Sequence, residues 1–143
     1  MSLSAEERRT LVEKELERAR ETFEEIEVLR QAGKWNGAAN RVYYSVFHAV
    51  NALLINDGIQ TVRHKSSHAL FSQNYIKTGK LPLEFGKLYN NLQTLREKSD
   101  YNCFYDVDEQ DINEGTELAR RFIEEIGKLI DQKKDNNVEP SKQ

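Results

Sequence analysis

The sequence predicts an all-α protein, an antiparallel up-and-down helical bundle of four long helices plus one short helix. Apolar residues recur at intervals of three and four through most of the chain, and no segment alternates polar and apolar residues as a half-buried strand would. Only two prolines and seven glycines interrupt the 143 residues. Charged residues make up 31%, and they are rich in Glu, Lys and Arg, which favour helices. Short loops join the expected helices, which is typical of a bundle.

The first helix is expected from about residue 4 to 31. Ser4 and Glu7 have the spacing of a capping box, in which each side chain accepts a hydrogen bond from a free backbone N–H at the helix start. Gly33 ends the helix. Its apolar stripe consists of Val12, Leu16, Ala19, Phe23 and Ile26.

The second helix is expected over about 35–56, where Asp57-Gly58 stops it. One face of this helix is apolar and should form core. That face consists of Ala39, Val42, Tyr43, Val46, Ala49, Val50 and Leu53. The opposite face consists of Asn40, Arg41, Tyr44, His48 and Asn51.

Three more segments complete the predicted bundle. A basic loop over 57–65 precedes a short helix that starts at Ser66 or Ser67 and reaches about residue 77. Pro82 suits the first turn of a fourth helix to about residue 98, and Asp108 can cap a fifth helix to about residue 132. Residues 1–132 are therefore predicted to form one domain, followed by a disordered polar tail over 133–143.

The middle of the chain is basic although the whole chain has a net charge of −3. Residues 34–80 carry six Lys or Arg against one Asp, and all three histidines lie there. Two interpretations are open: the basic zone faces an anionic partner, or helices match acid and base internally.

Compartment and site chemistry are constrained by what the sequence lacks. No apolar stretch is long enough to span a bilayer, no secretory signal pattern is present, and Cys103 is alone. We therefore expect a cytoplasmic protein that does not associate with membranes. No zinc-ligand spacing, phosphate-binding glycine loop or dinucleotide fingerprint occurs, so we predict neither a metal nor a cofactor.

Two pairs of Arg and His remain as candidate chemistry. Arg41 and His48 stand seven residues apart on one helix, about two turns, so both point the same way. Arg63 and His68 stand five apart across the basic loop and the start of the short helix, where they could converge. Such a pair suits metal-independent cleavage of RNA, because Arg holds the phosphate and His moves protons near neutral pH. The alternative for each pair is an ordinary solvated helix surface or basic loop.

A family resemblance rests on two stretches of the chain. Residues 38–50, with Arg41 followed by Tyr43 and Tyr44, resemble the signature helix of HEPN domains (higher eukaryotes and prokaryotes nucleotide-binding). Residues 95–101, Leu-Arg-Glu-Lys-Ser-Asp-Tyr, are similar to the second characteristic stretch of that family. The resemblance covers about residues 5–130.

The resemblance implies a helical bundle that is often a homodimer and often works with a small nucleotidyltransferase. Many members are metal-independent ribonucleases that act as toxins through an Arg-x(4–6)-His motif, and others bind nucleotides without that motif. In many toxins a tyrosine follows two residues after the histidine. Here Val50 and Leu70 occupy those places, so modification of such a tyrosine is not expected.

Two functional hypotheses follow, with a helical adaptor lacking any nucleic-acid role as a third. In the first, the protein is a toxin-like ribonuclease that uses Arg63 and His68 or Arg41 and His48. Tyr44, Asn51 and Lys65 would then contact the substrate by stacking, hydrogen bonding and charge. In the second, it is a non-catalytic nucleotide-binding or scaffolding partner of a nucleotidyltransferase. In that case we expect Asp100 to form a structural bridge to Arg96, four residues before it.

Overall fold

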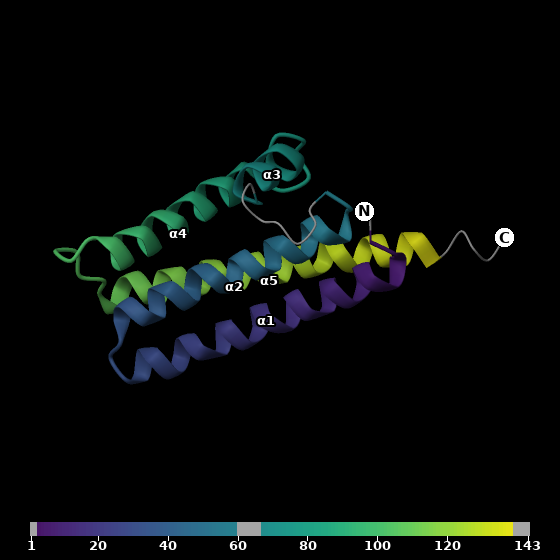
Figure 1. Cartoon of the computed structure of the whole chain (residues 1–143). Coiled ribbons are helices and arrows are strands. Elements are labelled where there is room, and N and C mark those ends of the chain that lie inside the picture. Colours follow the sequence, from purple (N-terminus) through teal and green to yellow (C-terminus); the bar gives the residue numbers. More distant parts are fainter. Residues whose placement is uncertain (1–2, 60–66, 139–143) are drawn as a thin grey trace.

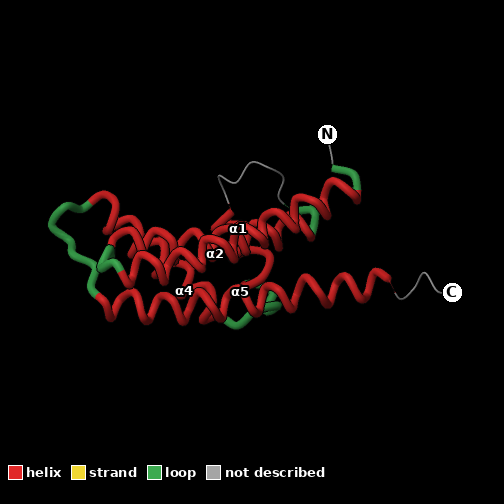
Figure 2. The backbone as a smooth tube through the Cα atoms, turned by 90° about the horizontal axis from the view of Figure 1, so that it is seen from below, coloured by secondary structure: helices red, strands yellow, loops and turns green. Residues whose placement is uncertain are grey.

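The computed structural model describes residues 3–59 and 67–138, and every regular element within them is a helix (Figures 1 and 2). The long helices are α1 (Ala5–Gln31), α2 (Trp35–Asn56), α4 (Leu83–Tyr101) and α5 (Glu109–Val138). The short helix α3 (Ser67–Phe71) continues into a π-helical turn, η1 (Ser72–Ile76). The all-α prediction of four long helices and one short one is confirmed.

The long helices alternate in direction, so α1 begins and α5 ends at the same end of the bundle (Figure 1). α2 contacts α1, α3, α4 and α5 and is the central helix. The whole apolar face predicted for α2 is buried, and Leu54 and Ile55 are buried as well. The core of the protein therefore lies around α2, and every other long helix covers part of it.

The predicted helix starts are confirmed. The Ser4 side chain accepts a hydrogen bond from the Glu7 N–H (3.0 Å), while the Glu7 carboxylate accepts one from the Ser4 N–H (2.9 Å). Asp108 and Asp111 form the same reciprocal arrangement at the start of α5, at 2.8 and 3.3 Å. Both caps satisfy backbone donors that the helix itself leaves free.

Two helix ends differ from the prediction. α4 extends to Tyr101 rather than stopping near Lys98, and α5 continues to Val138 rather than ending at Gln132. Once a helix is formed, each further residue adds a hydrogen bond at little cost, so a polar sequence can prolong it. Pro140 then disfavours helical geometry in the residue before it. Of the expected tail, residues 139–143 lie outside the described part of the chain.

Candidate functional site

Arg41 and His48 both contact carboxylates of α1. The His48 Nδ1 lies 2.7 Å from Oε1 of Glu15, and the Arg41 Nη1 donates a hydrogen bond to Oε1 of Glu25 at 3.1 Å. Each side chain therefore pairs with its own acidic partner rather than converging on a shared point. For these two residues, the structure supports the internal matching of acid and base between helices.

One residue predicted on the polar face of α2 is buried instead. Asn51 is only 3% exposed, so its expected placement at the surface beside His48 is wrong. The reason is that α2 is covered on nearly all sides, and a face that is polar in sequence need not be solvated. Among the described residues, the Asn51 Oδ1 meets no hydrogen-bond partner. Tyr44, on the same face, is half-buried, so part of its side chain reaches the surface.

His68 lies in an aromatic environment at the start of α3. Its ring meets the ring of Tyr89 edge-on, with centroids 4.4 Å apart. Burial lowers the pKa of His68, and the negative charge of Glu97 opposes that change only in part. His68 is therefore a neutral imidazole at pH 7 and able to accept a proton.

The other residues predicted around His68 lie outside the described part of the chain. Arg63 and Lys65 fall within residues 60–66. The pairing of Arg63 with His68 therefore stays a prediction from their spacing.

Arg96 of α4 lies at the centre of a cluster of tyrosines. Its Cζ lies 5.6 Å from the ring centroid of Tyr43, 5.4 Å from that of Tyr44 and 5.7 Å from that of Tyr101. Its Nε is 3.1 Å from Oδ2 of Asp100, which confirms the predicted bridge. Cation–π contacts of this kind fix a guanidinium in place while its positive charge persists.

The Arg96 cluster is continuous with His68. The Tyr43 ring stacks 6.0 Å from that of Tyr89, which also meets the ring of His68. Burial raises the pKa of both tyrosines, so their hydroxyls stay protonated at neutral pH. We define the α2–α4 face as Tyr43, Tyr44, His68, Tyr89 and Arg96. Its partly exposed members are a cation, Arg96, a ring that can stack on a base, Tyr44, and an imidazole that can take up a proton, His68. The buried Tyr43 and Tyr89 connect them.

Sequence reasoning identified Arg96 but did not assign it to the site. Its four-residue spacing from Asp100 indicated an ion pair within one helix. Its approach to Tyr43 and Tyr44 depends on how α4 packs against α2, which no local pattern encodes. The adjacent Tyr43 and Tyr44 were the available signal in the sequence. Neighbouring residues on a helix point in different directions, so at least one ring had to meet a residue of another helix.

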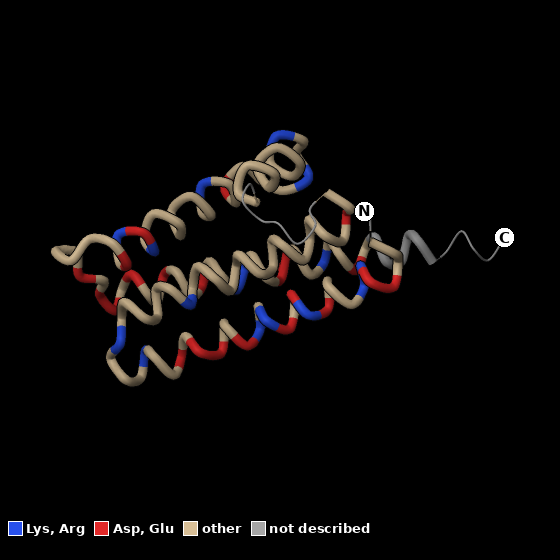
Figure 3. Tube along the Cα trace, in the orientation of Figure 1, with Lys and Arg blue, Asp and Glu red and all other residues tan. Residues whose placement is uncertain are grey.

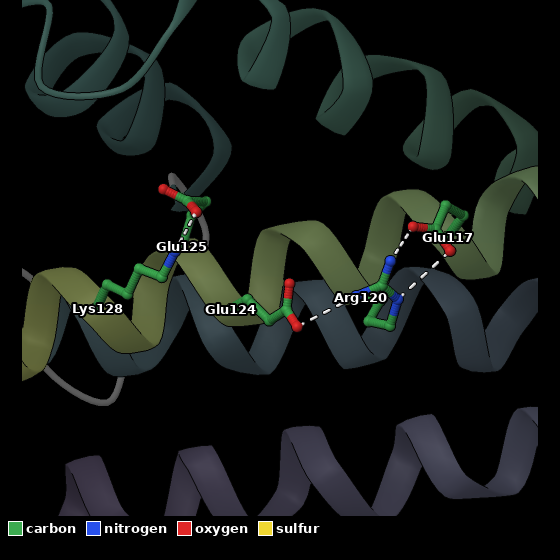
Figure 4. A network of polar contacts seen from close by, with 5 residues as sticks. All are labelled: Glu117, Arg120, Glu124, Glu125 and Lys128. Carbon is green, nitrogen blue, oxygen red and sulfur yellow. Dashed lines mark hydrogen bonds and ion pairs between the residues drawn. The ribbon is translucent and has the colours of Figure 1, made fainter.

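Charges on the outer surface of α5 are neutralised locally. Arg120 contacts Glu117 and Glu124, and Lys128 contacts Glu125 (Figure 4). Exposed pairs one turn apart on a helix contribute little to stability and leave little net charge for a ligand.

The described residues contain neither a membrane-spanning helix nor a cluster of metal ligands. None of their helices combines the length and apolar character needed to cross a membrane. Nowhere in residues 3–59 and 67–138 do three or more His, Cys, Asp or Glu side chains gather as they would around a metal ion.

Comparison with known proteins identifies the family. The model of the HEPN domain matches residues 12–129. The chain belongs to the HEPN domain family. A UPF0332 protein of Thermotoga maritima is 32% identical over 125 residues, which cover 87% of this chain and 95% of that protein. A protein of Methanocaldococcus jannaschii named "Putative toxin MJ0142" is 26% identical over 119 residues, covering 83% of this chain and 81% of that one.

In this HEPN domain the two stretches that carried the resemblance meet in space. Residues 38–50 lie on α2 and residues 95–101 on α4, and they touch where Arg96 contacts Tyr43 and Tyr44. These two stretches thus supply Tyr43, Tyr44 and Arg96 of the α2–α4 face, whereas His68 and Tyr89 come from outside them.

Proposed function

We propose that this HEPN domain is a metal-independent, toxin-like ribonuclease whose site is the α2–α4 face. The observation that carries the proposal is the contact chain from the half-buried His68 through Tyr89 and Tyr43 to the guanidinium of Arg96. A base and a phosphate-binding cation on one face are the minimum that RNA cleavage requires, because RNA supplies its own nucleophile.

In the proposed reaction, His68 removes the proton from a 2′-OH of the RNA. The 2′-oxygen then attacks the adjacent phosphorus, and the bond to the 5′-oxygen of the next nucleotide breaks. That oxygen receives a proton from water, and the protonated His68 later returns its own proton to the solvent, which leaves a cyclic phosphate and a free 5′-OH. Arg63 stabilises the charge that develops on the phosphate oxygens, while Arg96 and Tyr44 hold the neighbouring phosphate and base. Lys65, two positions before α3 in the sequence, would add positive charge.

The biological setting of the proposal follows from the resemblance. We expect a cytoplasmic homodimer that works with a minimal nucleotidyltransferase, and the name of the Methanocaldococcus jannaschii relative as a toxin agrees with a need for a neutralising partner. In the homodimer, Arg63 and His68 from both subunits would line one cleft and double its positive charge. A strictly monomeric protein in solution would contradict the shared cleft.

The decisive test is cleavage of a mixed RNA substrate in EDTA. We expect wild-type protein to cut and to leave cyclic phosphate ends, and Arg63→Ala to cut at least about a hundredfold more slowly. Arg120→Ala is the matched control, since it removes an arginine that is neutralised on α5. Equal rates for both variants, or cutting that needs an added metal, would contradict the proposal.

A second function is favoured by one specific observation. The Arg96 cluster is complete without any histidine, so it could hold a nucleotide in a protein that does no chemistry. In that case wild-type protein binds RNA or nucleotide without cutting it, and Arg96→Gln weakens the binding.

A further inference from the structure

The junction between α4 and α5 exposes aromatic residues to solvent. Among the described residues, four large apolar side chains are strongly exposed: Val28, Leu83, Tyr101 and Phe104. Two of them stand within four positions of each other, and Phe104 is 92% exposed. Aromatic residues this exposed and this close in the sequence are candidates for a binding surface.

The backbone of this junction is tied down on both sides of Phe104. The Phe104 N–H donates to the Asn102 side chain at 3.0 Å, and the Tyr105 N–H donates to the Asn102 carbonyl at 3.0 Å. Just beyond them, Lys98 lies over the ring of Tyr105, and Val107 is buried. Phe104 is therefore presented at the corner of a closed turn, and we call the exposed pair Tyr101 and Phe104 the aromatic tip.

The surroundings of the aromatic tip are acidic. Residues 96–111 contain six Asp or Glu against Arg96 and Lys98, and Figure 3 shows acidic positions gathered where the α4–α5 junction enters α5. One of the six, Asp100, pairs with Arg96. Arg30 approaches Glu109 at 3.9 Å from the end of α1, but it also pairs with Glu27. This charge repels RNA and anionic membranes and attracts a basic surface.

An open pocket of about 380 Å³ lies at the same end of the bundle, where the turn between α1 and α2 meets the α4–α5 junction. Trp35 and Lys34 line it from the turn between α1 and α2, and Asp106 and Val107 line it from the junction itself. The junction therefore offers an apolar projection and, two residues later, a hollow that could receive a side chain.

We propose that the aromatic tip docks an amphipathic helix of a protein partner, with apolar residues on one face and Lys and Arg on the others. Aromatic anchors with opposite charge around them are typical of the centre of a specific protein interface. Tyr101 also contacts Arg96 of the α2–α4 face, whereas Phe104 is not part of that face. A loss of peptide binding with RNA cleavage unchanged therefore separates the two proposals.

The test uses full-length protein and a synthetic probe of this chemistry. The probe is a fluorescent peptide of about 15 residues with Leu at helical spacing and Lys elsewhere, and its match has Glu in place of Lys. We expect saturable binding of the Lys peptide only, weakening as salt rises. The double variant Tyr101→Ser, Phe104→Ser should bind it at least about tenfold more weakly.

Leu83→Ser is the matched control, because it removes another exposed apolar side chain far from the tip. Its affinity for the Lys peptide should equal that of the wild-type protein. Circular dichroism and thermal melting should be unchanged in all variants, since these side chains are exposed. Absence of saturable binding, equal loss in Leu83→Ser, or no loss in the double variant would overturn the proposal. Tip-dependent binding of a single-stranded RNA oligonucleotide instead would also overturn it.

Discussion

The two sides of α2 place the same kinds of residue among different neighbours. Toward α1, His48 and Arg41 each face a carboxylate of another helix, Glu15 or Glu25. Toward α4, His68 packs against the ring of Tyr89, and Arg96 lies over three tyrosine rings while it pairs with Asp100 of its own helix. Arg41 approaches the ring of Tyr44 less closely, at 6.0 Å. Rings hold a cation in place without removing its charge. Arg and His spacing in the sequence therefore does not identify the functional pair; the neighbours from other helices do.

The largest expected effect is on stability and comes from removing the ring of Tyr89, which lies between Tyr43 and His68 on the α4 side of α2. Tyr89 is fully buried between Tyr43, His68 and Phe71. Tyr89→Ala should lower the free energy of unfolding by about 3–5 kcal/mol, because it leaves a cavity in the core. Urea unfolding followed by circular dichroism measures this. Tyr89→Phe keeps the ring and should be much less destabilised. If it lost as much free energy of unfolding as Tyr89→Ala, loss of ring packing would not be the cause of the destabilisation.

The next effect separates the two arginines. Arg96→Gln should weaken binding of an RNA oligonucleotide by about tenfold or more, while Arg41→Gln should change it by less than about threefold, since Glu25 already neutralises Arg41. Fluorescence anisotropy in a His68→Ala background, where the RNA stays intact, gives both affinities. A larger loss for Arg41→Gln would reverse the comparison.

A smaller effect is expected on the α1 side. Glu15→Gln removes the charge opposite His48, and both side chains are about three-quarters buried. We expect a loss of about 1 kcal/mol in stability and no change in RNA binding. Thermal melting measures the stability loss, and fluorescence anisotropy measures RNA binding on the same sample. Weaker RNA binding by Glu15→Gln would assign a role in binding to the α1 side.

The smallest effect is on pH dependence. Burial lowers the pKa of His68 in the folded state below its unfolded value. Between those two values the unfolded chain binds the proton more readily, so stability falls as pH falls below the ordinary histidine range. His68→Gln should flatten this dependence, as measured by urea unfolding at pH 7.5 and 5.5. The same slope in His68→Gln would indicate that another group is responsible.

The helices could be predicted because their signals are local. The Ser4 and Asp108 caps and the apolar stripes lie within a few residues of each other, and each survives in the structure. The ends of the helices were predicted less accurately. The polar residues at the end of α5 neither favour nor prevent a further turn of helix.

The site was harder to predict because it is assembled from separate helices. The burial of Asn51 follows from how many helices surround α2, and the role of Glu15 and Glu25 depends on the register of α1 against α2. The family resemblance located the right two stretches, 38–50 and 95–101. Their contact through Arg96 became visible only in three dimensions.

The most direct test of the account compares the two histidines in one assay. His48→Gln and His68→Gln would be measured side by side for cleavage of RNA in EDTA, with circular dichroism to show that both are folded. We predict that His68→Gln is at least about a hundredfold slower than wild type and that His48→Gln is within about threefold of it. Loss of cleavage in His48→Gln with activity retained in His68→Gln would contradict the assignment of function to the α2–α4 face.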